Sequence, residues 1–165
     1  MNNMFLTEKD FSFIVTKTPL VAIDFCIIQN NKLLLGKRKK SPGKNLYFVP
    51  GGRIQKNEKI LSACERILSN ELGQKLNKTF FLEENLIGVY EHFYNDNFLS
   101  NNKFSTHYVV FAYLLDYSLL TPGNIIPNDD QHSSFLWWDL LSKKDKNMHK
   151  YLSNYIDSIK KKLKC

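Results

Sequence analysis

Apolar residues occur in short runs separated by polar or turn-forming residues, a pattern typical of a sheet built from several strands. The runs "LVAIDFCII" (20–28) and "KLLLGKR" (32–38) are separated by "QNN", so we expect them to form a hairpin. The brief run "LYFVPGG" (46–52) is a strand stopped by proline and glycine. Further strands are expected at 85–94, 106–117 and 135–140. The segment 121–134, which precedes the last of them, is expected to be a loop.

Helical signals occur in three segments. Thr7 is a suitable N-cap for a short helix beginning near residue 8. Residues 60–72 place their apolar side chains on one arc and are followed by Gly73, a natural C-cap. The segment 142–163 has the pattern of an amphipathic terminal helix. Together these elements predict an α+β fold, with a mixed sheet sandwiched between helices, in a single domain over 1–165.

Glu71 is the exception on the apolar arc of the 60–72 helix. It falls in the middle of the arc formed by Ile60, Cys64, Ile67 and Leu68. An ionised side chain removed from water costs several kcal/mol unless a cation or good hydrogen bonds compensate for it. The sequence therefore predicts that Glu71 has a partner and a function.

Composition narrows the class of protein. A chain of 165 residues with 43% hydrophobic content can fill one core. It has no apolar run near the roughly 20 residues that span a bilayer, and its start does not resemble a signal peptide. Cys26, Cys64 and Cys165 have no paired spacing, so we expect reduced thiols, two of them in the core. We therefore expect a cytoplasmic protein.

The net charge of +7 has two interpretations. The lysines are spread along the surface and concentrated in the tail "KKKLKC", which indicates a solvated helix face. No basic motif interleaved with aromatic residues accompanies the charge, so we expect neither a nucleic acid nor a membrane as partner. A basic surface also suits steering of a phosphorylated small substrate.

The run "GRIQKNEKILSACERILSNELG", preceded by "PG", resembles the Nudix box. The shared frame is Gly52, a glutamate six residues later, then Arg66, Glu71 and Gly73. The resemblance implies the α/β/α Nudix fold, in which loop, helix and loop present carboxylates to Mg²⁺ beside a diphosphate. It thus implies that the partner of Glu71 is a metal ion.

Two positions depart from the box. Ile67 and Asn70 stand where the family carries glutamates, and both lie on the Glu71 side of a helical wheel. A Nudix enzyme that cleaves at phosphorus needs such a carboxylate cluster to activate water. The remaining carboxylate is enough for one metal ion, and its isolation points away from ordinary attack at phosphorus.

The altered box is similar to that of the GDP-mannose mannosyl hydrolases within the Nudix superfamily. The similarity extends through "MFLTEKDF", "TPLVAIDF", "LLLGKR", "YFVPGGR", "VYEHFYNDNF", "THYVV" and "DDQHSSFLW". It implies hydrolysis of GDP-α-D-mannose, with GDP-glucose as a second candidate substrate, to GDP and the free hexose. Water attacks the anomeric carbon with inversion in that reaction, which depends on one Mg²⁺ per subunit, with Mn²⁺ as a substitute. A homodimer concerned with surface polysaccharide metabolism is also implied.

The resemblance assigns roles to individual residues. Glu71, Gln131 and the backbone carbonyl of Gly51 match the metal ligands, and His132 matches the catalytic base. Arg38 matches a residue that contacts the diphosphate, and Arg53, which follows the glycine pair, is placed to reach the same leaving group. Phe5, Leu6 and Phe11 match residues that touch the nucleotide, and Arg38 is thus a substrate contact as well. Asp24 interrupts an apolar run, so it either is paired or binds a sugar hydroxyl, and Tyr108 is a candidate hydrogen-bond donor to the leaving phosphate.

Alternatives remain for several of these residues. Leu6 and Phe11 are also spaced as a hydrophobic staple, Arg38 suits a solvated strand end, and Tyr108 suits a buried strand position. Arg66 either orients Glu71 or pairs with a neighbouring carboxylate. His107, in a strand, and His149, on the terminal helix, suit packed or solvated positions.

Two other functions compete with glycosyl hydrolysis. One is a conventional Nudix pyrophosphatase, which would split a nucleotide sugar into GMP and a sugar 1-phosphate. The other is a non-catalytic Nudix module that senses a nucleotide sugar. Ile67 and Asn70 disfavour the first, and the combination of Glu71, Gln131 and His132 disfavours the second.

Overall fold

A computed structural model describes residues 6–77, 79–123, 125, 130–144 and 146–163 of the chain. Its helices are α1 (Glu8–Lys17), α2 (Ile60–Leu72), α3 (Leu82–Asn85), the 3₁₀ helix η1 (Tyr117–Leu119) and α4 (Leu152–Leu163). Its strands are β1 (Leu20–Gln29), β2 (Lys32–Arg38), β3 (Tyr47–Phe48), β4 (Gly51–Arg53), β5 (Leu86–Tyr94), β6 (Thr106–Asp116) and β7 (His132–Asp139). This architecture confirms the predicted fold class.

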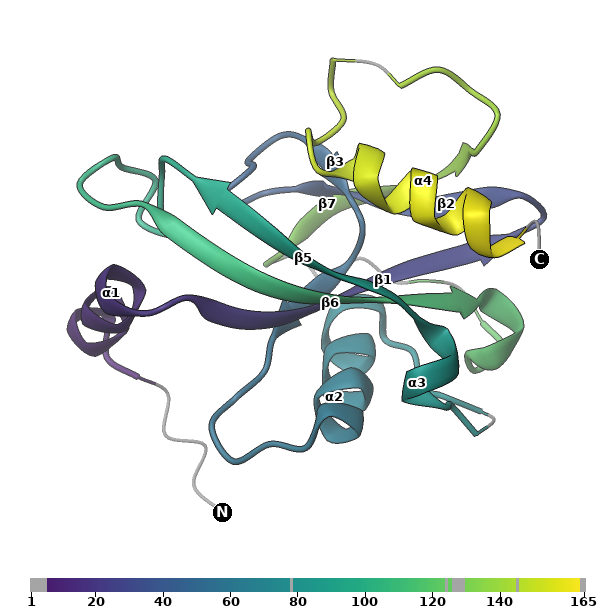
Figure 1. The fold of residues 1–165 in the computed structure, drawn as a ribbon, viewed down its shortest axis with the longest axis horizontal. Coiled ribbons are helices and arrows are strands. Elements are labelled where there is room, and N and C mark those ends of the chain that lie inside the picture. The colour runs from purple at the N-terminus through teal and green to yellow at the C-terminus, as the bar shows by residue number, and fades with distance from the viewer. Residues whose placement is uncertain (1–5, 78, 124, 126–129, 145, 164–165) are drawn as a thin grey trace.

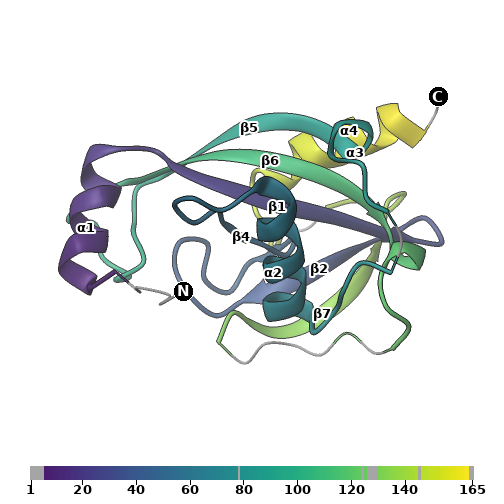
Figure 2. The same cartoon turned by 90° about the horizontal axis from the view of Figure 1, so that it is seen from below.

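The strands form one mixed sheet with a central path β3-β2-β1-β6-β5. Strands β1 and β6 run parallel, whereas β4 pairs with β1 and β7 pairs with β2 in antiparallel fashion. Helices α2 and α4 lie on opposite faces of the sheet, and α1 extends beyond one end of β1 (Figures 1 and 2). The sheet thus separates two environments, one under α2 and one under α4.

Alternation along β1 divides the core between these two faces. Ile23 and Phe25 belong to the cluster that packs against α2, whereas Cys26 belongs to the cluster beneath α4. Cys26 and Cys64 are buried free thiols, as predicted, and Cys165 lies outside the described residues. Across the described part of the chain, no helix is both long and apolar enough to span a bilayer.

Local sequence signals give the observed turns and caps. Asn30 and Asn31 both have positive φ, which suits the tight turn between β1 and β2. The Thr7 side chain accepts a hydrogen bond from the backbone N–H of Asp10 and caps α1. Gly73 ends α2 in the left-handed conformation, with φ of 64°.

The structure corrects three boundaries. Strand β7 begins at His132 and not at residue 135, so His132 is a strand residue. Helix α4 begins at Leu152, so the prediction of a helix from residue 142 is wrong for the first part of that segment. Asn85 belongs to the single-turn helix α3 and not to the following strand.

Candidate functional site

Glu71 and His132 meet on the α2 side of the sheet. The Nδ1 atom of His132 lies 3.2 Å from Oε2 of Glu71, and the two residues are 2% and 8% exposed. Glu71 Oε2 and both imidazole nitrogens of His132 are buried and form no hydrogen bond with any residue that the structure describes. Helix α2 and strand β7 therefore bring together one buried carboxylate and one buried imidazole.

Gly36 makes room for the imidazole. It lies on β2, which pairs with β7, and a Cβ added to it would be 2.4 Å from Cδ2 of His132. The ring of Phe135 packs on the imidazole with 5.0 Å between centroids. A side chain at position 36 is incompatible with the observed place of the His132 ring.

The two altered positions of the box lie in different surroundings. Ile67 is 2% exposed and belongs to the core cluster, where a Cβ added to Gly52 would be 3.1 Å from its Cγ1. Asn70 is exposed, so it does not share the buried environment of Glu71. Helix α2 thus packs an aliphatic side chain beneath the Gly51–Arg53 strand.

Arg66 pairs with Glu58, which settles the two alternatives for this arginine. Its Nε donates to Oε1 of Glu58 at 2.6 Å and its guanidinium also donates to Oε2 at 2.7 Å. It further donates to the carbonyl of Arg53 at 2.8 Å. These hydrogen bonds lower the pKa of Glu58 and tie α2 to the end of β4.

Arg53 is supported by the N-terminal helix. Its guanidinium lies 4.0 Å from the centroid of the Phe11 ring, a cation–π contact. Phe98 packs on Phe11 with 4.6 Å between ring centroids. Of the residues predicted to contact substrate, Phe11 therefore contacts Arg53, while Leu6 is 50% exposed ahead of α1 and Phe5 lies outside the described residues.

Tyr108 lies within electrostatic reach of both predicted diphosphate arginines. Burial raises the pKa of the Tyr108 hydroxyl, and the charges of Arg53 and Arg38 oppose that increase. The side chain of Arg38 is held by a hydrogen bond from its Nε to the carbonyl of Pro42 at 2.9 Å. The fold thus gathers Arg38, Arg53 and Tyr108, which come from three different strands.

Asp24 lies on the α4 side of the sheet and is 8% exposed. Its Oδ2 accepts a hydrogen bond from the Tyr155 hydroxyl at 2.6 Å, which supplies the partner that a buried carboxyl needs. Burial raises the pKa of Asp24 to about 7, although Tyr155 and the charge of Arg38 act to lower it. Asp24 pairs with Gly51 across the β1–β4 ladder, and a Cβ added to Gly51 would be 2.2 Å from Oδ1 of Asp24.

Sequence reasoning does not find the polar groups around Asp24. Tyr155 and His92 read as core or strand residues, yet their side chains are 3.2 Å apart and Tyr155 contacts Asp24. His149 is wrongly placed on the terminal helix by the sequence; it precedes α4, is 4% exposed and packs on Phe48. Burial lowers the pKa of His92 to about 3 and that of His149 to about 4.

The remaining predicted residues have simple surroundings. Gln131 is half-buried beside His132, and its backbone carbonyl accepts a hydrogen bond from the N–H of Lys39 at 2.9 Å. His107 packs on Phe93, with 4.3 Å between ring centroids, and its Nε2 lies 3.6 Å from Glu91. Gln131 therefore adjoins the site, whereas His107 has the packed position that the sequence allows for it.

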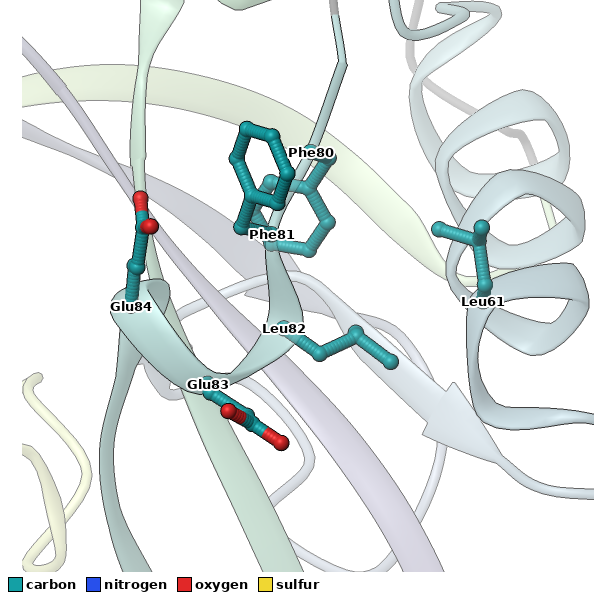
Figure 3. Close-up of a pocket in the computed structure, with 6 residues that line it drawn as sticks. All are labelled: Leu61, Phe80, Phe81, Leu82, Glu83 and Glu84. Carbon is teal, nitrogen blue, oxygen red and sulfur yellow. The ribbon is translucent and has the colours of Figure 1, made fainter.

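A separate hollow lies between α2 and α3 (Figure 3). Its volume is about 280 Å³, and it is lined by Leu61, Phe80, Phe81, Leu82, Glu83 and Glu84. None of the predicted site residues contributes to this lining. The hollow offers two exposed carboxylates and no imidazole or guanidinium, so it does not match the predicted chemistry.

The residues around Glu71 fit a divalent cation. A buried carboxylate oxygen without a hydrogen-bond partner in the described chain is a suitable ligand for such an ion. Nowhere do three or more His, Cys, Asp or Glu side chains among the described residues form a metal-binding group. A cation bound here would therefore complete its shell with neutral oxygens, such as those of Gly51 and Gln131, with water, and with substrate.

Comparisons with known proteins agree with this architecture. The sequence model of the NUDIX domain family matches residues 18–157, and the chain belongs to that family. A low-salt glycan biosynthesis protein, Agl8, of Haloferax volcanii is 28% identical over 154 residues, which are 93% of this chain and 90% of that protein.

Two solved structures share the fold. The MutT NUDIX hydrolase from Burkholderia pseudomallei has a TM-score of 0.69 and 22% identity, covering 87% of this chain and 99% of its own. A bifunctional NMN adenylyltransferase/ADP ribose pyrophosphatase from Francisella tularensis, complexed with AMP and a manganese ion, has a TM-score of 0.60 and 22% identity. That match covers 93% of this chain and 44% of the Francisella chain.

Proposed function

We propose that this Nudix protein hydrolyses GDP-α-D-mannose, with GDP-glucose as a second candidate substrate, to GDP and the free hexose by attack of water at the anomeric carbon. The observation that carries the proposal is the contact between His132 on β7 and Glu71 on α2. The same helix has Ile67 at a position where the box carries a carboxylate. An isolated carboxylate beside an imidazole suits one metal ion and one base. The name of the Haloferax relative, a glycan biosynthesis protein, agrees with a sugar-containing substrate.

His132 is the proposed general base. Nδ1 of His132 lies 3.2 Å from Oε2 of Glu71, which favours a proton on Nδ1, and the neutral imidazole then keeps the lone pair on Nε2 for a proton of the attacking water. Electrostatic attraction to the Glu71 carboxylate would favour this tautomer and this ring orientation. Nε2 is itself buried, so the proposed role requires that water be admitted to it when substrate binds.

The arginines act on the leaving group. GDP departs readily once its developing charge is neutralised, so the reaction needs no general acid. Arg38 and Arg53 are the proposed diphosphate ligands, and Tyr108 lies within electrostatic reach of both guanidinium groups. Phe11 holds Arg53 by its ring face and leaves the N–H edges of the guanidinium available for phosphate oxygens.

A divalent cation, Mg²⁺ or Mn²⁺, is the proposed cofactor. Glu71, Gln131 and the carbonyl of Gly51 would hold it, and it would supply charge neutralisation at the diphosphate. Asp24, which adjoins Gly51 across the ladder, is the proposed acceptor for a sugar hydroxyl. Gly51 on β4 would therefore join the metal end of the site, on the α2 side of the sheet, to the sugar end, on the α4 side.

We also propose that the protein is a homodimer. Val89 and Phe93 lie on β5, at the end of the central strand path, and each is 53% exposed. Exposed apolar side chains on such a strand are suited to contact with a second chain. Analytical ultracentrifugation of the wild type and of Phe93→Glu tests this directly, and a monomeric wild type would contradict it.

Product analysis in ¹⁸O-labelled water tests the reaction. Incubation with GDP-α-D-mannose and Mg²⁺ should give GDP and mannose, with the label in mannose and the β-anomer appearing first. GMP with mannose 1-phosphate would instead identify a conventional Nudix pyrophosphatase. Substrate binding without turnover would identify a nucleotide-sugar sensor, and either of these outcomes contradicts the proposal.

A further inference from the structure

A buried hydrogen-bond network connects α4 to Asp24, at the sugar end of the proposed site. The Tyr155 hydroxyl lies 2.6 Å from Oδ2 of Asp24 and 3.2 Å from Nε2 of His92. Tyr155 is fully buried, and Asp24 and His92 are 8% and 3% exposed. These residues belong to α4, β1 and β5, so one hydroxyl joins three elements that are distant in sequence.

Tyr155 has a single hydroxyl proton, and this proton determines the direction of its hydrogen bonds to Asp24 and His92. Because Tyr155 donates it to the Asp24 carboxylate, the hydroxyl can only accept from His92. His92 must then carry its proton on Nε2. Tyr155 therefore fixes the orientation of the Asp24 carboxyl group and the tautomer of His92 together.

The ring of Tyr155 is itself held from several sides. Phe48 stacks on it with 5.5 Å between centroids, and Tyr90 meets it edge-on at 4.8 Å. The hydroxyl of Tyr90 donates to Ser158 of the same helix at 2.7 Å. The ring has little freedom to turn, so its hydroxyl is a rigid reference point for Asp24.

The orientation of Asp24 matters because its two oxygens face different parts of the fold. Oδ2 is taken by Tyr155, whereas Oδ1 lies toward Gly51, where an added Cβ would be 2.2 Å away. Oδ1 is therefore the oxygen nearer β4, the strand that carries Gly51, a proposed metal ligand, and Arg53, a proposed diphosphate ligand. A carboxylate free to rotate would lose this distinction between its oxygens.

The geometry points to Tyr155 as the positioning residue for sugar recognition, holding Asp24 so that Oδ1 is presented to a hydroxyl of the hexose. This inference rests on the proposed function, which supplies the sugar. It assigns a role in the site to the C-terminal helix, none of whose residues the sequence points to. The role is specific to the sugar end, because Tyr155 makes no hydrogen bond to Arg38, Arg53 or Tyr108 in the described chain.

Tyr155→Phe tests the role, because it removes the hydroxyl and keeps the ring. The KM for GDP-mannose should rise roughly 10- to 100-fold, as expected for a lost hydrogen bond to a charged group. The inhibition constant of GDP, which has no hexose, should stay within about twofold of the wild-type value. A residue that merely supports the fold would weaken the binding of both.

Two further variants make the result decisive. Tyr90→Phe removes a hydroxyl that bonds to the same helix but not to Asp24, so its KM should equal that of the wild type. In an Asp24→Asn background, Tyr155→Phe should add little further loss, because both changes remove one interaction. If the wild type is active and Tyr155→Phe leaves the KM unchanged, this inference alone is overturned. If the wild type does not hydrolyse GDP-mannose, the proposed function is overturned, and the role of Tyr155 in sugar recognition with it.

Discussion

Nδ1 of His132 lies 3.2 Å from Oε2 of Glu71, so the helix that carries the box and the last strand of the sheet share one carboxyl group. The sequence predicts a partner for Glu71, and the fold places the imidazole of His132 beside it, in addition to the proposed metal ion. The Glu71 carboxylate is therefore placed both to orient the proposed base and to serve the proposed cation. Changes at this pair should therefore affect metal dependence and base function together.

Glu71→Gln should reduce turnover by roughly 10- to 100-fold or more at millimolar Mg²⁺. Loss of a residue that only supports a metal ligand already costs that much. Glutamine keeps the shape of the side chain but removes its charge, so the melting temperature should change little. Activity measured over a Mg²⁺ titration, with thermal unfolding alongside, checks this. Glu65→Gln, an exposed change on the same helix, is the matched control, and near wild-type rates in Glu71→Gln would refute the ligand assignment.

Gly36→Ala should displace the imidazole without altering any predicted site residue. The new Cβ would lie 2.4 Å from Cδ2 of His132, so the ring has to move. We expect a loss in kcat of roughly 10²- to 10⁴-fold, the usual contribution of a positioned base. His132→Gln should cause a similar loss, and the double variant should be no worse than either. Full activity in Gly36→Ala would show that the observed ring position is unrelated to catalysis.

Phe11→Leu should lower kcat/KM by roughly 2- to 30-fold, because a cation–π contact contributes about 0.5–2 kcal/mol. The change removes the ring on which the Arg53 guanidinium rests at 4.0 Å. Phe11→Tyr keeps an aromatic face and should retain activity. Phe13→Leu, at a 66% exposed position of the same helix, is the control in steady-state kinetics. Equal losses in Phe11→Leu and Phe11→Tyr would argue for direct contact with the nucleotide.

Asp24→Asn should stabilise the protein at neutral and alkaline pH. Burial raises the pKa of Asp24 from 3.8 to about 7, so the folded state binds this proton more tightly than the unfolded chain. The resulting stabilisation is complete below pH 3.8 and is lost as pH rises to about 7. The Asn variant lacks this loss, so its free energy of unfolding should exceed that of the wild type by up to about 4 kcal/mol at pH 8. The difference should be smaller near pH 4.

Urea unfolding of both proteins from pH 4 to pH 8 measures this difference. His92 and His149, whose pKa values are lowered to about 3 and about 4, destabilise the folded state as pH falls below 6.5. That effect is common to both proteins, so the difference between them isolates Asp24. A difference that does not change with pH would mean that Asp24 titrates normally.

Local signals account for the parts of the fold that the sequence predicts well. The Thr7 cap, the Asn30–Asn31 turn and the Gly73 C-cap depend on residues that are close in the chain. The start of α4 depends on distant contacts instead. Met148 pairs with Tyr47, and the N–H of His149 donates to the carbonyl of Tyr47 at 3.0 Å, so this stretch is extended beside β3 despite its helical pattern.

The candidate site shows the same division. Glu71 is visible in the sequence because a carboxylate interrupts an apolar arc, and Asp24 because it interrupts an apolar run. Their partners are not visible, since Tyr155 fits the apolar face of α4 and His132 is placed by the pairing of β7 with β2. Anomalous residues can be recognised from sequence, whereas the groups that compensate them are assembled only by the tertiary fold.

The burial of Ile67 limits which side chains this position of the box can hold. Its side chain fills the space beneath Gly52 and is 2% exposed, so a glutamate there would place an unpaired charge in the core. Such a charge costs several kcal/mol, a large fraction of the stability of a small domain. A glutamate introduced at this position alone would therefore leave the domain poorly folded, so packing itself holds an aliphatic side chain at this position of the box.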